Sequence, residues 1–470
     1  MINFKHFTPE ALPGLIPYLR RLDGFCSDMT AGYLAMWSEG EDIRFCIEND
    51  TLILWWDEND QPCFSLPVGA ESEKMTAELL DYARENDLSL RFYPVSKKQL
   101  NALENDERFQ PLRSCCSRMW SDYIYCFEDV LTFGGRKFSR QRNHINQFKK
   151  LYGEPELRFI EKADEKDILH MLKRYEEEHP ERSRFEDWEL RKTKQILQDF
   201  DKYGMLAACL TVEGEIAAFS IGEVVGETLV IHVEKALREY EGSYPVMYQG
   251  FARLVCEHLG RPLAYINRED DSGDLGLRTS KLRYHPVFIE DKYIVFAGSP
   301  ASKVSELPVI DGGKVFLTPF RKTDKREYFV LNTDVENNRF WGYDYREDIC
   351  IPAEPDENVF YDALMEDMQL GDSINFAVRL SEGGKMIGEG ILWHFTPDGK
   401  AELGCRISPE YHGRGYGSSV IRMLAEFAQE TLGLRCWAKF YLENSASYRI
   451  CEKAGMRFMK QDEEFFYFTY

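Results

Sequence analysis

The sequence predicts a mixed α/β protein built from three lobes, and three observations support this class. The 470 residues leave room for about three domains, since a domain usually holds roughly 100–200 residues. Short β-branched and aromatic runs alternate with segments of helical periodicity. Gly, Pro and Ser gather between residues 297 and 313, as in a linker. The predicted units are therefore 1–134, 135–297, the linker 298–313 and 314–470.

The first two units follow a similar predicted plan. In the first, strand-like runs separated by acidic turns indicate an antiparallel meander, followed by a helix and another strand: 43–47, 51–56, 62–66, 74–86 and 88–92. In the second, the spacing predicts a helix, three strands, a helix and a strand: 166–178, 205–212, 215–224, 228–233, 247–259 and 263–266. Two similar mixed α/β lobes in tandem are expected.

Composition excludes several classes of protein. A formal charge of -22 opposes non-specific binding to nucleic acid or anionic membranes. No segment approaches the ~20 apolar residues of a membrane span, and the N-terminus lacks the plan of a signal peptide. The 12 cysteines include no Cys-x-x-Cys pair with His partners, so neither a zinc site nor disulfides are expected. We expect a soluble cytoplasmic protein with reduced thiols and no bound metal.

The strongest local pattern lies in the last unit. Predicted strands at 386–395 and 401–408 lead into the loop His412-Gly413-Arg414-Gly415-Tyr416-Gly417 and a helix at 418–430. Glycines let a backbone approach a phosphate closely, and the unpaired amides from Arg414 to Ser418 can point at a pyrophosphate. The loop lacks the Lys-Ser/Thr ending of a P-loop and the spacing of a dinucleotide fingerprint. A strand at 434–441 follows, with Asn444 and Ser447 at the start of a short helix that Gly455 closes.

These residues closely resemble the Gcn5-related N-acetyltransferase (GNAT) superfamily, and within it the group that acetylates protein N-termini. Gly415, Gly417, Asn444 and Ser447 match its pattern over residues 314–470, whereas His412 and Met456 replace the usual Gln/Arg and Phe. The resemblance implies acetyl-coenzyme A as the acyl donor and an acceptor-side segment at 340–344. It implies donor-binding residues at Ile407, Ser408, His412, Gly413, Arg414, Gly415, Tyr416, Gly417, Ser418 and Asn444.

Direct attack of an amine on a thioester needs a base for the amine and an acid for the leaving thiolate. Alternation along strand 401–408 places Ala401, Leu403, Cys405 and Ile407 on one face, with Glu402 on the other. Glu402 is the first candidate for the base or for the anchor of a relaying water, and Glu389 is the second; a solvated or salt-bridged strand carboxylate is the alternative for each. Ser447, Tyr448 and Cys451 are candidate acids, with a helix-cap hydroxyl and a core thiol as the alternatives for Ser447 and Cys451. Backbone amides near Ile407 would stabilise the oxyanion.

Two polar segments stand out in the first 300 residues. Residues 136–150 hold six Lys or Arg and no acid, a pattern that suits either a phosphate-bearing ligand or a solvated helix face. Residues 267–281 predict a polar loop with glycines, of the kind that often lines a site. The candidate site residues, for which a plain polar loop is an equal alternative, are Arg142, His144, Asn267, Glu269, Arg278 and Lys281.

With His232–Ala236 and Tyr240–Tyr244, these segments resemble a bacterial family related to the C-terminal domain of phosphatidylglycerol lysyltransferase, over roughly residues 1–297. The resemblance implies two tandem acetyltransferase-type lobes. The lysyltransferase relatives move an amino acid from aminoacyl-tRNA to a lipid.

The sequence therefore favours tandem GNAT-like lobes followed by a C-terminal GNAT domain. The expected function is acetyl-CoA-dependent N-acetylation of a primary amine, on a small molecule or a peptide N-terminus. One alternative is an aminoacyl-tRNA-dependent transferase centred on the N-terminal unit, with tRNA as partner. Another is a non-catalytic acetyl-CoA sensor. The identity of the acceptor amine stays open.

Overall fold

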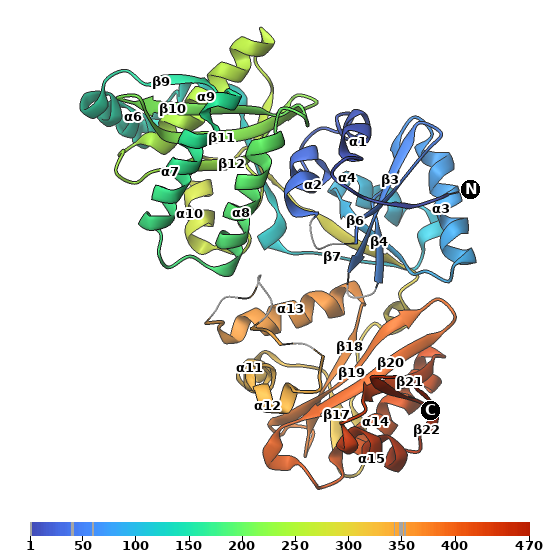
Figure 1. The fold of residues 1–470 in the computed structure, drawn as a ribbon. Helices are drawn as coiled ribbons and strands as arrows, with labels where there is room; N and C mark the ends of the chain where they lie inside the picture. The colour runs from blue at the N-terminus through green and yellow to red at the C-terminus, as the bar shows by residue number, and fades with distance from the viewer. Residues whose placement is uncertain (1, 39–41, 59–60, 343, 347–350, 352–353) are drawn as a thin grey trace.

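Three β-sheets organise the chain in the computed structural model, which describes residues 2–38, 42–58, 61–342, 344–346, 351 and 354–470 (Figure 1). The first two sheets lie together in the upper half of Figure 1, and the third, drawn in orange and red, forms the lower half. This arrangement confirms the predicted mixed α/β class.

The first sheet holds residues from the start of the chain and one strand from much later. Its strands are β1 (Lys5–His6), β2 (Arg44–Glu48), β3 (Thr51–Glu58), β4 (Gln61–Phe64), β5 (Val68–Gly69), β6 (Leu90–Val95), β7 (Leu112–Cys116) and β15 (Tyr293–Ala297). Its helices are α1 (Leu12–Leu19), α2 (Ala31–Trp37), α3 (Ser72–Glu85) and α4 (Lys97–Glu104). Helix α3 corresponds to the predicted helix at 74–86. Its apolar residues Met75, Leu79 and Ala83 recur at helical spacing and are buried.

The second sheet is built from residues 122–290. Its strands are β8 (Asp122–Cys126), β9 (Glu156–Phe159), β10 (Leu206–Val212), β11 (Glu215–Val225), β12 (Thr228–Ala236), β13 (Tyr265–Asn267) and β14 (Phe288–Glu290). Its helices are α5 (Phe127–Thr132), α6 (Ser139–Tyr152), α7 (Glu165–Glu178), α8 (Arg184–Asp199), α9 (Ser243–Leu259) and α10 (Leu275–Leu282). The predicted helix at 247–259 begins four residues earlier, because Gly242 turns the chain into it.

The third sheet belongs to the C-terminal domain. Its strands are β16 (Ile310–Asp311), β17 (Phe316–Thr318), β18 (Ile374–Arg379), β19 (Met386–Thr396), β20 (Lys400–Ile407), β21 (Arg435–Tyr441), β22 (Arg457–Gln461) and β23 (Phe465–Thr469). Its helices are α11 (Lys325–Thr333), α12 (Val335–Asn338), α13 (Glu357–Leu370), α14 (Tyr416–Phe427) and α15 (Ser445–Ala454). Two apolar clusters, one with α14 and α15 and one with α11 and α13, cover its two faces.

All three sheets share one plan. Each has an antiparallel meander whose last strand pairs in parallel with the strand that follows a helix: β4 with β6 after α3, β12 with β13 after α9, and β20 with β21 after α14. Two further antiparallel strands complete each sheet. The two predicted tandem lobes and the C-terminal domain are thus repeats of one architecture.

The first two lobes exchange strands. β8 follows β7 in the sequence but pairs in the second sheet, and β15 follows β14 but returns to pair with β6 and β7. The division between these lobes therefore differs from the predicted boundary after residue 134. Two chain crossings hold the lobes together, which makes residues 1–297 a single structural unit.

The segment predicted as a linker, 298–313, packs against the third lobe. The Ser299 hydroxyl donates to the Gly371 carbonyl at 2.9 Å, Ala301 is buried in the C-terminal core, and β16 pairs with β17. A further ion pair between Arg91 and Asp372, 2.7 Å apart, joins the first and third lobes. The Gly, Pro and Ser residues suggested a linker, but the segment is packed against the third lobe.

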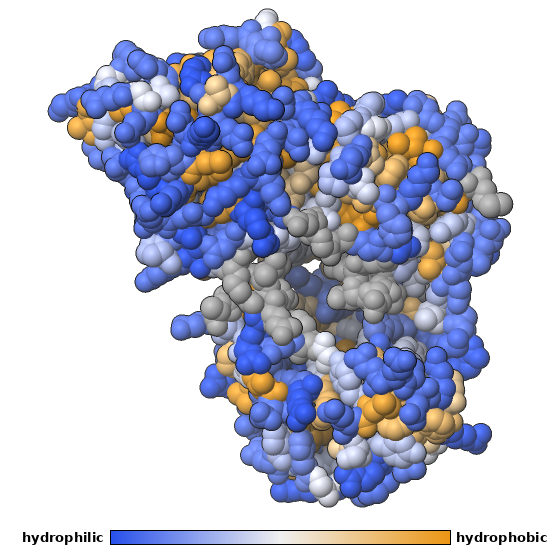
Figure 2. Space-filling model, viewed as in Figure 1, coloured by the Kyte–Doolittle hydropathy of each residue, from blue (hydrophilic) through white to orange (hydrophobic). Residues whose placement is uncertain are grey.

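The face of the molecule in Figure 2 is mostly hydrophilic. On the face in Figure 2, hydrophobic residues form small separate groups among charged and polar ones. Among the described residues, no helix has both the length and the apolar character needed to cross a bilayer.

Candidate functional site

The glycine loop of the third lobe lies between the end of β20 and the start of α14. Gly413 and Gly415 adopt φ angles of 76° and 79°, in the left-handed region that favours glycine, and Gly415 is the N-cap of α14. Within the described residues, the backbone N–H groups of 413–418 have no acceptor. These amides, at the positive end of a 12-residue helix, are available to an anion.

Side chains shape and charge this loop. His412 Nε2 donates to the Ile407 carbonyl at 2.7 Å, and Arg414 donates to the Glu410 carbonyl at 3.1 Å, so both hold the loop in place. A Cβ atom at Gly415 would lie 3.7 Å from Nζ of Lys314. Lys314 adds a positive charge that sequence analysis missed, because it stands about 100 residues before the loop with no motif around it.

The loop opens onto a divergence between two parallel strands. β20 pairs with β21 only at residues 400–402, opposite 435–437, whereas the rest of β21 pairs with β23. Beyond Glu402 the two strands therefore separate, with the glycine loop at the wide end. Asn444 and Ser447 lie there too, because β21 ends at Tyr441 and the Asn444 side chain accepts from the Ser447 amide at 3.1 Å.

Two candidate acids occupy apolar surroundings. The Tyr448 ring packs edge-on against Phe440, Phe466 and Phe468. Cys451 is 3% exposed within the C-terminal core, and burial raises the pKa of its thiol to about 12. This environment favours the core-thiol interpretation of Cys451 and leaves Ser447 as the candidate at the opening.

The predicted faces of β20 are observed: Ala401, Leu403 and Ile407 lie in the core with α14. On the other face, Glu389 is 1% exposed and accepts from Arg406 at 2.5 Å and from Asn375 at 2.7 Å. Both carboxylate oxygens of Glu389 are thus engaged within the protein.

Glu402 lies on the same face at the last paired position. It is 2% exposed, and its Oε2 accepts from Nδ1 of His394 at 2.6 Å. Trp341 and Trp393 lie beside Gly404, where a Cβ would meet Trp393 at 2.7 Å. Trp341 belongs to the predicted acceptor segment, of which Tyr343 lies outside the described residues.

In the N-terminal unit, the predicted residues of the segment 267–281 lie together, since Oδ1 of Asn267 accepts from the Glu269 amide at 2.7 Å, whereas Arg142 and His144 lie on α6. Arg142 donates to the Phe133 and Gly135 carbonyls, and Arg278 binds Asp271 through two 2.8 Å contacts. Asn267 donates to Asp122 at 2.9 Å, and Lys281 donates to the Arg268 carbonyl at 2.6 Å. The polar groups of both side chains are thus used in hydrogen bonds inside the protein. These residues were predicted as site residues because the segments around them are polar. In the structure, most of their side chains stabilise turns and strand ends.

Glu269 belongs to a buried triad that the sequence did not reveal. Nδ1 of His232 lies 2.7 Å from Glu269, and Nε2 lies 3.0 Å from Glu223. Burial lowers the pKa of His232, but the bonds with Glu223 and Glu269 outweigh that effect and raise it to about 10. His232 is therefore charged at neutral pH, at the contact between α2 and β12.

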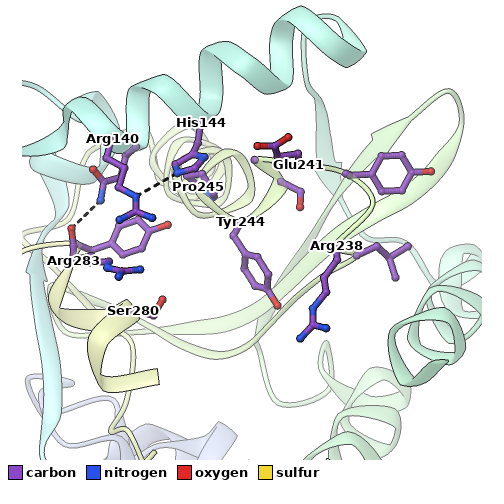
Figure 3. Close-up of a pocket in the computed structure, with 14 residues that line it drawn as sticks. Arg140, His144, Arg238, Glu241, Tyr244, Pro245, Ser280 and Arg283 are labelled. Atoms are coloured by element: carbon purple, nitrogen blue, oxygen red, sulfur yellow. Dashed lines mark hydrogen bonds between the residues drawn. The ribbon is translucent and has the colours of Figure 1, made fainter. Parts of the chain in front are cut away.

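His144 instead lines a pocket of about 310 Å³ at the start of α9 (Figure 3). Arg140 and His144 project into it from α6, and Arg283 faces them from the end of α10. Nε of Arg140 donates to Nε2 of His144 at 3.5 Å, and Oε1 of the buried Gln141 has no donor among the described residues. Gly242 is the left-handed N-cap of α9, as Gly415 is of α14.

Behind Tyr284, which lines this pocket, lies a buried polar group. The Arg268 guanidinium stacks on Tyr248 and Tyr284 at 4.4 and 5.0 Å and pairs with Glu234 at 2.9 Å. In the described part of the chain, one nitrogen of Arg268, one oxygen of Glu234 and the Tyr248 hydroxyl lack hydrogen-bond partners. Buried polar atoms without partners are costly, which indicates a place for polar ligand groups.

In the first lobe, the helix that corresponds to α9 and α14 is α3, and it does not begin with a glycine. Glu71 is the N-cap of α3, with φ of -109°, and Glu73 lies in its first turn. Two carboxylates at a helix start disfavour an anionic ligand. A left-handed glycine therefore caps the helix start in the second and third lobes, whereas a glutamate does so in the first.

Comparison with known proteins finds a matching family for each of the two parts of the chain. Residues 19–296 match the family model "Phosphatidylglycerol lysyltransferase, C-terminal", and residues 314–457 match the acetyltransferase (GNAT) domain. A conserved protein of unknown function from Bacteroides thetaiotaomicron is 28% identical, with a TM-score of 0.57, over 63% of this chain and all of that chain. The structure of L-PGS from Bacillus licheniformis is 16% identical, with a TM-score of 0.43, over 62% of this chain and 93% of that chain.

An uncharacterised protein of Mycoplasmoides gallisepticum is 26% identical over 180 residues, which are 37% of this chain. The chain spans 56% of the length of that curated relative. Acyltransferase-type domains thus occupy both parts of the molecule, as the sequence predicted. The chain belongs to the family of the phosphatidylglycerol lysyltransferase C-terminal domain and carries a GNAT acetyltransferase domain at its C-terminus.

Proposed function

We propose that the C-terminal domain is an acetyl-CoA-dependent N-acetyltransferase that transfers an acetyl group to a primary amine. The observation that carries the proposal is the row of unpaired amides at 413–418 beside the divergence of β20 and β21. The residues fit a pyrophosphate, because Gly413 and Gly415 leave the backbone exposed and Lys314 supplies a counter-charge.

The residues around the divergence would then have distinct roles. Acetyl-CoA supplies the activated acyl group along β20, and the amides of the glycine loop bind its phosphates. Ser447 at the wide end would donate a proton to the leaving sulfur, and backbone amides near Ile407 would stabilise charge on the thioester oxygen. Glu402 and its partner lie on the acceptor face, where the amine would lose its proton.

Isothermal titration with acetyl-CoA tests the site with two matched variants of Gly415. Asn and Asp both tolerate a left-handed φ, and they have nearly the same volume, but only Asp adds a negative charge. We expect Gly415→Asn to bind within about threefold of wild type, and Gly415→Asp to bind about 10- to 100-fold more weakly, since a charge-assisted bond contributes ~1.5–3 kcal/mol. Wild-type protein that binds no acetyl-CoA would contradict the proposal.

A second candidate function is aminoacyl transfer by the N-terminal unit. The unpartnered atoms of Arg268, Glu234 and Tyr248 favour it, because they suit an aminoacyl ester: a carboxylate and phenol for the ammonium, a guanidinium for the carbonyl. The neighbouring Arg140 and Arg283 suit the phosphates of a tRNA acceptor end.

Removal of single charges from α6 tests this candidate. Arg140 lines the pocket, whereas Lys150 is exposed on the same helix outside it. We expect Arg140→Ala to weaken tRNA binding about 10-fold and to lower the salt dependence, since one phosphate contact is lost. Lys150→Ala should stay within about twofold. Equal effects of both variants, measured by fluorescence anisotropy at two salt concentrations, would exclude the pocket.

A further inference from the structure

His394 stands at an irregularity in strand β19. The register between β19 and β20 breaks between Trp393 and Thr396, and His394 adopts φ of 47°. A left-handed conformation in a non-glycine residue costs of order 1–3 kcal/mol and persists where the surroundings hold it. This bulge turns the imidazole toward β20 instead of leaving it on a regular strand face.

The imidazole forms a dyad with a buried carboxylate. Nδ1 of His394 lies 2.6 Å from Oε2 of Glu402, whose side chain is 3% exposed. A carboxylate accepts, so Nδ1 carries the hydrogen and Nε2 keeps a lone pair in the neutral ring. In the described part of the chain Nε2 has no partner, and the side chain is 24% exposed. The dyad thus presents an accessible, oriented base.

The dyad also lies at the narrow end of the gap between β20 and β21, where the two strands begin to separate. Glu402 is the last residue of β20 that pairs with β21, at Trp437. It faces away from α14, on the side of Trp341 and Arg406. An acyl donor whose phosphates bind the glycine loop at the wide end would extend between the two strands. Its acyl group would then lie at the narrow end, near Glu402.

The first lobe fixes the bulge from outside. The Ser89 hydroxyl donates to the carbonyl of Phe395, the residue after His394, at 3.1 Å, and both groups are buried. The buried Arg91 pairs with Asp372 at 2.7 Å and lies 4.1 Å over the Phe296 ring. The strand that presents His394 is therefore anchored by residues of the N-terminal unit.

We propose that His394 takes the proton from the acceptor amine, with Glu402 as its positioning residue and Ser89 of the first lobe holding the bulge. This inference rests on the proposed N-acetyltransferase function. Nε2 removes one proton from the ammonium, and the free amine nitrogen attacks the thioester carbon. The C–N bond forms and the C–S bond breaks. Ser447 donates its proton to the leaving sulfur and takes up the second proton of the amine. The imidazolium then returns its proton to water.

Chemical rescue separates this role from a structural one. Thiol release is followed with acetyl-CoA and three probe amines: spermidine, a peptide with a free N-terminus and an aminoglycoside. We expect His394→Ala to lower kcat/KM about 100-fold or more, as for loss of a general base, with acetyl-CoA affinity within about threefold. Added imidazole should restore the rate at least about 10-fold in this variant but not in the control His258→Ala, which alters a histidine of the second lobe.

Two further variants test the supporting residues. Glu402→Gln can still hold the ring but not its positive charge, so we expect a loss of about 10- to 100-fold in kcat with little change in KM. Ser89→Ala leaves the C-terminal domain intact and should lower kcat severalfold.

The outcomes distinguish this inference from the proposed function. If wild-type protein acetylates a probe amine and His394→Ala does so equally well, the dyad is not the base. Loss of activity in His394→Ala without rescue by imidazole also overturns the inference, because a structural role explains it. Wild-type protein that binds acetyl-CoA but acetylates none of the probes would overturn the proposed function as well.

Discussion

Replacement of Lys292 by alanine is expected to cost about 3–5 kcal/mol, because it leaves buried carboxylates without their counter-charge. Lys292 lies between β14 and β15, where the chain returns from the second sheet to the first, and its side chain is 2% exposed. Nζ lies 3.1 Å from Asp122 and 3.3 Å from Asp270, and it pairs with Asp28.

The charge of Lys292 is held by this cluster. Burial lowers the pKa of Lys292, but Asp122 and Asp28 outweigh that effect and hold it well above the usual range. Asp28 comes from the first lobe and also accepts from the Tyr93 hydroxyl at 2.8 Å. Without the lysine, repulsion among the carboxylates would separate the two lobes at their crossing.

Hydrogen exchange measures this opening locally, which suits a protein with several domains. We expect amides of β8 and β15 to exchange about 100-fold faster or more in Lys292→Ala. The triple variant Lys292→Met, Asp28→Asn, Asp122→Asn removes most of the unpaired charge and should recover much of the protection. Unchanged exchange in Lys292→Ala would show that the cluster does not hold the lobes together.

Local patterns predicted most elements but not the way the lobes are joined. The meanders, the helix at 74–86 and the strand–loop–helix around Gly415 follow from short-range spacing, and the structure has them close to the predicted bounds. The pairing of β15 with β7 joins residues about 180 positions apart, and no local signal marks such a pairing. The predicted boundary after residue 134 differs from the observed exchange for this reason.

The candidate sites show the same division. Gly415 and Asn444 were predicted because backbone conformation and capping have local sequence rules. His394, His232 and Lys314 were missed, since a lone histidine in a strand and a lone lysine resemble ordinary surface or core residues. Conversely, Arg142 and Arg278 stood out by charge, yet the structure ties them to carbonyls and to Asp271. Charge density alone does not distinguish a ligand site from a structural anchor.

A methyl group added at Gly32 should weaken the contact between the first two lobes by about 3 kcal/mol or more. The Gly32 amide on α2 donates to Glu223 at 2.6 Å, and a Cβ there would lie 2.2 Å from the His232 ring. The ring cannot move aside, because Glu223 and Glu269 hold both of its nitrogens. In Gly32→Ala, α2 must therefore withdraw from β12, and the charged triad loses its amide donor.

Gly14→Ala provides the matched control, since Gly14 lies in helix α1 of the same lobe and a Cβ there meets nothing within 4 Å. Alanine is the better helix former, so this variant should be stabilised by about 0.5–1 kcal/mol. Urea unfolding of both variants, with hydrogen exchange of α2 and β12, gives the comparison. A Gly32→Ala protein as stable as Gly14→Ala would mean that α2 and β12 tolerate separation, and that the triad does not depend on their close approach.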